Sequence, residues 1–468
     1  MNIDLITGFP GCGKTEMMLQ EAAATPARYL FSVPTIDLID EHAKRFRAIC
    51  PAAHCLTIHS QSGAKDSVGR RITKLPETYL AGGHVAAFLT HEALMDASFE
   101  EFTGWHARID ETPDAVKAGT LRLGQGVAGF KAEFELTSVD ETNWSQLRLR
   151  DGKNSWKQSV GDSLWSNLSD FRRLSCRPEG VLVDMNSWEQ AQTGGEIKWF
   201  SVWTPISLRA FDSVTIAGAG FLSSVAYKVI SSTYKTLTFN IRDLNAARLG
   251  QPNITIRYFT GGHTGSTFFW TTSEGRRCLV AIQTWLTEHC PDLDIWSGND
   301  VVRASFEHRI AGKMTKPKLA GLNSHRAATS CAFFYSSKSL PDDVALRDIF
   351  QLTDADIHAA REGEDVFQFV SRGAIRDRAY DGPFNIFLYS QDQAEHLKAR
   401  LLSSGFRHVE ICAVSDAGIL DVKRASGRNA APISATDSEQ RASEKKAANA
   451  RRNRELRARK RKAKTQDE

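Results

Sequence analysis

Short apolar runs alternate with amphipathic stretches from the first residues of the chain. Ile3 to Thr7, Arg28 to Val33 and Gly83 to Thr90 each have the length and composition of a buried β-strand. Glu16 to Ala24 and Ile36 to Ile49 carry good helix formers or apolar residues at helical spacing. Strands that alternate with helices are typical of a parallel sheet with helices on both faces, so the pattern predicts an α/β fold.

The alternation is interrupted once and then resumes, which divides the chain into parts. From about residue 125 to residue 209 the pattern of strands and helices is lost. We expect a first domain at 1–260 that contains this insertion, a second α/β domain at 266–420 and a tail at 421–468. Within the second domain, Thr267 to Thr271 has the composition of a strand.

Tryptophan is concentrated in the insertion. Six of the ten tryptophans lie there: Trp144, Trp156, Trp165, Trp188, Trp199 and Trp203. With interleaved bases such as Arg148 and Arg150, these aromatics could stack on single-stranded bases. The alternative is that they fill a small core of the insertion, and we favour this alternative because aromatics dominate core packing.

The net charge of +4 is unevenly distributed. From Lys423 to the C-terminus, fifteen lysines and arginines face six acidic residues. We expect this basic tail to be disordered because it has few apolar residues to bury. Its cations would either contact nucleic-acid phosphates without reading sequence or keep the protein soluble.

The eight cysteines include no C-x-x-C pair, which favours a reducing compartment, so we expect a cytoplasmic protein. Cys50, His54, Cys55 and His59 could ligate zinc, but zinc sites usually place a longer loop between ligand pairs, so we favour separate structural roles. We expect no signal peptide, and no apolar run reaches the roughly 18 residues of a membrane span.

An octet with phosphate-binding character, residues 8–15, stands between the first apolar run and the first helical stretch. Its sequence fits G-x-x-x-x-G-K-[ST] in the strand–loop–helix context that this motif requires. The glycines let backbone N–H groups surround a phosphate, Lys14 supplies a cation, and the Thr15 hydroxyl can ligate Mg²⁺. The predicted nucleotide contacts are Gly8, Pro10, Gly11, Cys12, Gly13, Lys14 and Thr15.

A carboxylate pair, Asp110 and Glu111, follows the predicted strand Trp105 to Ile109. In the same sheet as a phosphate-binding loop, Asp110 would hold Mg²⁺ and Glu111 would activate the attacking water. Further along, Asp365 to Arg376 has helical composition, and we expect Gln368, Arg372 and Arg376 to share one face of that helix. Arginines so placed could stabilise charge that develops on a γ-phosphoryl group.

Together these motifs resemble those of superfamily 2 (DEAD/DEAH-type) helicases, and the layout is similar to that of helicase-like proteins of phages and plasmids. Residues 8–15 resemble motif I, 31–38 motif Ia, 88–94 the T-H-x-x-L element, 109–113 motif II and 368–376 motif VI. Motif II reads Asp-Glu-Thr-Pro here. Motif III would be Ala217-Gly218-Ala219, which lacks the two hydroxyls that the family uses to couple hydrolysis to strand movement.

The resemblance implies two tandem RecA-like P-loop domains with parallel sheets that hydrolyse ATP with Mg²⁺ in the cleft between them. The catalytic residues it implies are Lys14, Asp110, Glu111, Gln368, Arg372 and Arg376. The nucleic-acid contacts it implies are Pro34, Thr35, Thr90 and His91.

We therefore expect an ATP-dependent helicase or translocase, acting on single-stranded DNA in preference to RNA, in the replication of a mobile element. One alternative is a phage DNA-packaging motor ATPase, whose nuclease would require acids such as Asp292 and Asp294. Another is an ATP-switched nucleic-acid-binding protein that does not unwind its substrate, which the altered motif III would fit.

Overall fold

The computed structural model describes residues 1–422 except 63–65, 124–126, 140, 151–167, 178, 192–194, 234–236, 246–247, 264, 318–324 and 338–342. Residues Met1–Leu420 form one compact unit. The predicted basic tail from residue 423 onward lies outside the described residues, as do Trp156 and Trp165. Within the described ranges, none of the helices combines the length and apolar composition that a membrane crossing requires.

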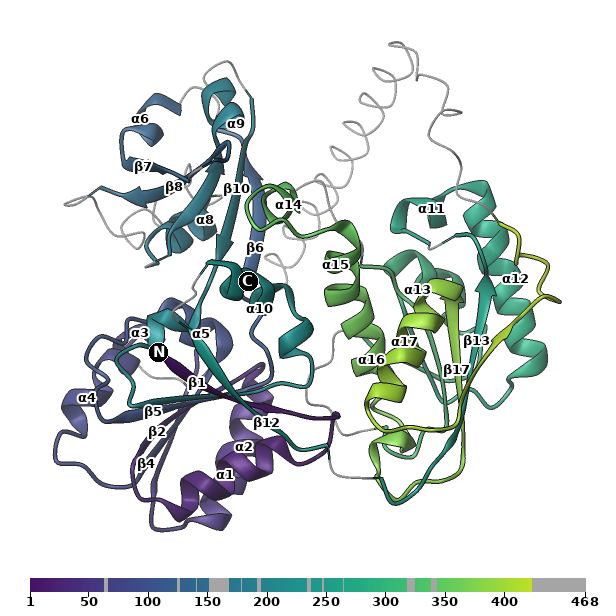
Figure 1. The fold of residues 1–468 in the computed structure, drawn as a ribbon, viewed down its shortest axis with the longest axis horizontal. Helices are drawn as coiled ribbons and strands as arrows, with labels where there is room; N and C mark the ends of the chain where they lie inside the picture. Colours follow the sequence, from purple (N-terminus) through teal and green to yellow (C-terminus); the bar gives the residue numbers. More distant parts are fainter. Residues whose placement is uncertain are drawn as a thin grey trace, which may run out of the picture. The chain divides into compact units, whose positions relative to one another are not determined.

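The first sheet has seven parallel strands in the order β12-β1-β11-β5-β2-β4-β3 (Figure 1). These strands are β1 (Asn2–Thr7), β2 (Arg28–Val33), β3 (His54–Ile58), β4 (Val85–Thr90), β5 (Trp105–Asp110), β11 (Ser213–Ala217) and β12 (Thr238–Asp243). Parallel strands joined by helical crossovers are buried on both faces. The six residues of β2 accordingly include five that are buried.

Helices cover both faces of this sheet, as Figure 1 shows. On one face α1 (Lys14–Ala24) and α2 (Ile36–Ile49) pack on Phe31 of β2, and on the other face α5 (His91–Asp96) packs on Leu30. Adjacent residues of a strand point to opposite faces, so the two apolar clusters alternate along β2. The remaining helical segments of this region are α3 (Val68–Thr73), α4 (Leu75–Thr78), the short turns Pro205–Leu208 and Phe221–Ser223, and α10 (Val225–Thr233).

The insertion forms an antiparallel sheet of five strands in the order β6-β10-β9-β8-β7. Its elements are β6 (Val116–Leu121), α6 (Val127–Lys131), β7 (Phe134–Ser138), β8 (Trp144–Leu149), α8 (Ser169–Ser175), β9 (Val181–Asp184), α9 (Met185–Gln190) and β10 (Ile197–Val202). The sheet begins at Val116 and not near residue 125, because β6 pairs along its whole length with β10. Trp188 and Trp199 lie in the insertion's own apolar core, as we favoured, whereas Trp203 belongs to the core of the first sheet and Trp144 packs in a cluster with Phe350.

A second parallel sheet of six strands has the order β15-β14-β16-β17-β13-β18. Its strands are β13 (Asn253–Thr260), β14 (Ile295–Gly298), β15 (Lys313–Met314), β16 (Ser330–Phe334), β17 (Pro383–Ser390) and β18 (Val409–Ala413). Its helices are α11 (Thr267–Thr271), α12 (Ser273–His289), α13 (Asp300–Phe306), α14 (Val344–Asp348), α15 (Asp354–His358), α16 (Glu364–Val370) and α17 (Gln391–Ser403), with a π-helical turn at Ala359–Gly363. The predicted α/β class with two parallel sheets is thus confirmed.

Two expectations about the start of this second sheet were wrong. Residues up to 260 were placed in the first domain, whereas β13 pairs with β17 and β18 of the second sheet. The chain therefore passes between the sheets after Asp243 and before Asn253. The expected strand Thr267–Thr271 is helical because Ser266 caps it, accepting a hydrogen bond from the Phe269 N–H at 3.0 Å.

The expected helix from Asp365 to Arg376 ends at Val370, and a 3₁₀ turn follows at Ala374–Arg376. Gly373 lies so close to Phe384 that a Cβ added there would be 2.5 Å from its ring. The Ala374 N–H donates to the Ala328 carbonyl at 2.7 Å, a partner outside the helix. The segment therefore leaves the helix to pack on the sheet, and Arg372 and Arg376 do not share a helix face with Gln368.

Candidate nucleotide site and adjoining cleft

The phosphate-binding loop leaves the carboxyl end of β1 and enters α1 at Lys14. Gly8, Gly11 and Gly13 have φ values of 140°, 89° and 96°, in the region that disfavours side chains. The turn over Pro10 closes with a 3.1 Å hydrogen bond from the Cys12 N–H to the Phe9 carbonyl. The glycines predicted to shape the loop thus adopt the backbone conformations that only glycine adopts readily.

The Lys14 ammonium group lies within this loop. It donates to the carbonyl oxygens of Gly8 at 2.9 Å and Phe9 at 3.2 Å, and the side chain is buried. A phosphate group that enters the loop would meet this cation directly. The loop opens at the N-terminus of an 11-residue helix, where backbone N–H groups also attract an anion.

Asp110 stands beside the loop because of the strand order. Strands β1 and β5 flank β11, and both Ile6 and Asp110 pair with Ala217. The Thr15 hydroxyl donates to Asp110 Oδ1 at 2.8 Å. A hydroxyl and a carboxylate are the hard oxygen ligands that Mg²⁺ prefers, so Thr15 and Asp110 together fit the predicted ion.

Glu111 is held in an unusual backbone conformation, with a φ of 67° in the left-handed region. Its N–H donates to the Ala217 carbonyl at 2.7 Å, which fixes this conformation. Such strain at a non-glycine residue is concentrated at functional sites. Burial first, and then the adjacent Asp110 carboxylate, raise the pKa of Glu111 to about 7, close to the value that suits a general base near neutral pH.

Two buried histidines contact Asp110, one from α2 and one from α5, which lie on opposite faces of the sheet. His42 of α2 places Nε2 at 3.0 Å from Asp110 Oδ2. His91 places Nε2 at 2.9 Å from the Asp110 carbonyl oxygen, and burial lowers the pKa of His91 to about 4. The sequence assigned His91 to the nucleic acid, whereas this ring nitrogen lies against motif II, and His42 was not singled out at all.

The arginine side of the site comes from the second sheet. Arg376 crosses over the phosphate-binding loop, since a Cβ added to Gly11 would be 2.6 Å from Arg376 Cγ. Arg372 is buried, and burial lowers the pKa of its guanidinium to about 10, so it keeps its charge at neutral pH. Charge interactions link each arginine to Glu111. Arg376 is therefore at the phosphate-binding loop, and Arg372 lines the same cavity as Glu111, although the helix ends before both.

Gln368 donates through Nε2 to Glu364 Oε1 at 2.7 Å. Glu364 is a second acid that the sequence did not single out. It also pairs with Arg400 and lies against Gly220, where an added Cβ would be 2.1 Å from Glu364 Oε2. The negative charge of Glu364 contributes to the raised pKa of Glu111. Glu364 thus connects the turn after β11 to the helix that carries Gln368.

A cavity of about 1130 Å³ adjoins this site, and Pro34, Thr35, Thr90, Glu111 and Gln368 are among the residues that line it. Both threonines cap helices: the Thr35 hydroxyl accepts from the Leu38 N–H, and the Thr90 hydroxyl accepts from the Ala93 N–H at 3.2 Å. The predicted nucleic-acid residues are therefore brought together at one cleft.

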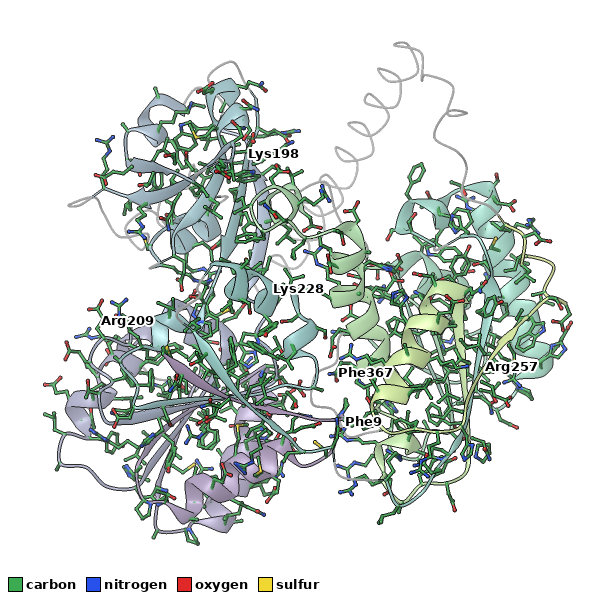
Figure 2. All side chains as sticks on the ribbon, viewed as in Figure 1. Phe9, Lys198, Arg209, Lys228, Arg257 and Phe367 are labelled. Carbon is green, nitrogen blue, oxygen red and sulfur yellow. The ribbon has the colours of Figure 1, made fainter. Side chains whose placement is uncertain are left out.

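The phosphate-binding loop also packs directly on the second sheet's core. The Phe9 ring meets Phe367 edge-on at 5.5 Å and Phe406 at 5.2 Å, and Figure 2 labels Phe9 and Phe367. The guanidinium of Arg248 lies 4.2 Å from the centre of the Phe406 ring. The phosphate-binding loop is thus in direct contact with the apolar core of the second sheet, the part of the chain that contains both arginines.

The fold resembles that of several solved structures. Apo XPD matches with a TM-score of 0.54 and 12% identity, covering 88% of this chain and 97% of that chain. S. tokodaii Xpd4 matches with a TM-score of 0.45 and 10% identity, over 88% of this chain and 96% of the other. A DEAD box protein from Methanococcus jannaschii matches with a TM-score of 0.26 and 8% identity, over 88% of each chain.

This chain has the fold of two tandem RecA-like domains. At 12% identity, the likeness to XPD establishes the fold and not the activity. A scan against protein-family models and a search of curated proteins found no match.

Proposed function

We propose that this chain is an ATP-dependent nucleic-acid helicase or translocase. The observation that carries the proposal is the position of Arg376, which reaches from the second parallel sheet across Gly11 of the phosphate-binding loop. Because Arg376 and the phosphate-binding loop belong to different sheets, ATP hydrolysis would depend on the distance between the two sheets. Such dependence is how a hydrolysis cycle can drive movement along a strand.

The proposed chemistry follows from the side chains around the loop. Glu111 would accept a proton from a water molecule as the water oxygen attacks the γ-phosphorus and the bond to the β–γ bridging oxygen breaks. Lys14 and Arg376 would stabilise the negative charge that develops on the phosphoryl oxygens. A magnesium ion held by Thr15 and Asp110 would neutralise the charge of the β- and γ-phosphates.

The proposed substrate is a single strand, with DNA favoured over RNA, and the proposed setting is the replication of a mobile element. The 1130 Å³ cavity supports a polymer site beside the ATPase centre, since Thr35, Thr90 and Glu111 all line it. Phosphate groups could accept hydrogen bonds from the backbone N–H groups where α2 begins.

An ATP-switched binding protein is a second candidate because of the turn after β11. Ala217-Gly218-Ala219 has no hydroxyl, and a Cβ added to Gly218 would be 2.8 Å from Thr112 Oγ1. The Thr112 hydroxyl of motif II therefore lies against this turn. Because the turn has no hydroxyl of its own, it would depend on Thr112 to couple hydrolysis to strand movement. The packaging-motor alternative is not favoured. Its nuclease would require acids such as Asp294, whereas Asp294 Oδ2 already accepts hydrogen bonds from the N–H groups of Thr329 at 2.8 Å and Ser330 at 3.0 Å.

The test is ATP hydrolysis measured with no nucleic acid, single-stranded DNA, duplex DNA and RNA. We expect hydrolysis to be stimulated most by single-stranded DNA. Arg376→Ala should abolish most of the stimulated rate, while the exposed control Arg407→Ala should keep it. Binding of ATP without turnover under all four conditions would favour the switch instead, and failure to bind ATP would exclude both candidates.

A further inference from the structure

His42 occupies the buried face of α2, the helix that covers the same side of the sheet as α1 (Figure 1). Its neighbours on that face include Ile39 and Phe46, which are fully buried, and His42 itself is only 4% exposed. An imidazole placed among such residues loses its contact with water, so it needs a polar partner in the protein. That partner is the carboxylate of motif II.

The Asp110 carboxylate is held at both oxygens. Thr15 Oγ1 donates to Oδ1 at 2.8 Å, and His42 Nε2 lies 3.0 Å from Oδ2. A carboxylate oxygen accepts a hydrogen bond from an imidazole N–H, so this contact assigns the N–H of the ring to Nε2. His42 Nδ1 is buried and has no hydrogen-bond partner among the residues that the structure describes, so the bond to Asp110 is the polar contact that the ring makes there.

We propose that His42 is a positioning residue for the divalent-metal site: its bond to Oδ2 holds the Asp110 carboxylate so that Oδ1, next to the Thr15 hydroxyl, faces the ion of the nucleotide complex. The inference rests on the proposed function, because it takes Thr15 and Asp110 as the metal-binding pair. Carboxylates that bind metals are commonly oriented by such hydrogen bonds, and removing the partner typically weakens metal affinity about 10- to 100-fold.

The proposal also gives α2 a direct connection to the metal site. This helix begins at Ile36, immediately after Thr35 in the wall of the cavity, and His42 lies on the same helix. A displacement of α2 by a bound strand would therefore move the donor that orients Asp110.

The test measures nucleotide binding and does not need turnover. The affinity of the full-length protein for a fluorescent ATP analogue is determined in EDTA and at increasing Mg²⁺ concentrations, and the tightening relative to EDTA is the Mg²⁺ effect. We expect His42→Ala to require about 10- to 100-fold more Mg²⁺ for half-maximal tightening, with an unchanged affinity in EDTA. His42→Gln, whose amide N–H can reach Oδ2, should restore most of the effect.

The matched control is His106→Ala, which removes a histidine from the opposite end of β5, where His106 bonds to Ser213. This variant should keep the wild-type Mg²⁺ effect. If His42→Ala is too unstable to study, His42→Gln and His42→Leu are compared, and equal Mg²⁺ effects in those two variants would overturn the proposal. An unchanged Mg²⁺ effect in His42→Ala would also overturn the proposal. If the wild type itself shows no Mg²⁺ effect, Thr15 and Asp110 are not a metal-binding pair, and the proposed function fails with them.

Discussion

Replacing Glu111 by glutamine should stabilise the protein, and the gain should grow with pH. Burial and the nearby Asp110 carboxylate raise the pKa of Glu111 from an ordinary 4.5 to about 7. Each pH unit between the unfolded and folded pKa values corresponds to about 1.4 kcal/mol. Ionised Glu111 therefore costs the folded state about 3 kcal/mol in total.

The sign follows from proton binding. Below pH 4.5 the carboxyl is protonated in both the folded and the unfolded states, so it has little effect on the free energy of unfolding. Between pH 4.5 and pH 7, Glu111 ionises in the unfolded state while it stays protonated in the folded state. The free energy of unfolding therefore falls as pH rises through this range. Glutamine has no charge to desolvate, so the gain for Glu111→Gln should be about 1 kcal/mol at pH 5 and about 3 kcal/mol at pH 8.5.

The assay is equilibrium unfolding in urea for the wild type and Glu111→Gln at these two pH values. The control is Asp114→Asn, because Asp114 is a nearby acid whose side chain is exposed. We expect the control to show no comparable gain at pH 8.5. Equal gains at both pH values for Glu111→Gln, or a loss at pH 8.5, would refute the reasoning, because the site would then not disfavour the charge on Glu111.

Three further predictions concern the loop and the residues that approach it. Arg376→Ala should lower kcat for ATP about 10³-fold or more with a smaller change in KM, measured by steady-state hydrolysis, because an arginine of this kind acts on transition-state charge. The hydrolysis rate should decrease as pH is lowered through about 7, because Glu111 becomes protonated there. Glu364→Gln should move this decrease to lower pH, since removing a negative charge lowers the pKa of Glu111. Phe9→Ala should lower the thermal midpoint, because Phe9 is only 7% exposed, and Phe9→Leu should recover part of the loss.

The parts of the site that the sequence revealed are local patterns. The phosphate-binding loop is one run of eight residues, and Asp110 and Glu111 are adjacent at a strand end, so spacing alone identified them. The strand order then brought Asp110 to Thr15, as expected when parallel strands end at the same edge of a sheet. The α/β class was equally accessible, because apolar runs alternate with helical stretches along the chain.

What the sequence did not reveal depends on contacts between distant residues. The bond between His42 and Asp110 joins positions 68 apart, and a histidine on an apolar helix face has no local pattern that marks its partner. The end of α16 at Val370 depends on the contact of Gly373 with Phe384. The pairing of β13 with the second sheet likewise could not be deduced from its apolar composition.

Movement along a strand is the central claim, and ATP-dependent displacement of streptavidin from a biotinylated single-stranded DNA tests it most directly. We predict that the wild type accelerates displacement from one end of the oligonucleotide, and that the exposed-lysine control Lys44→Ala does the same. Lys14→Ala, which removes the cation inside the phosphate-binding loop, should not. ATP hydrolysis by the wild type with no acceleration at either end would contradict the claim.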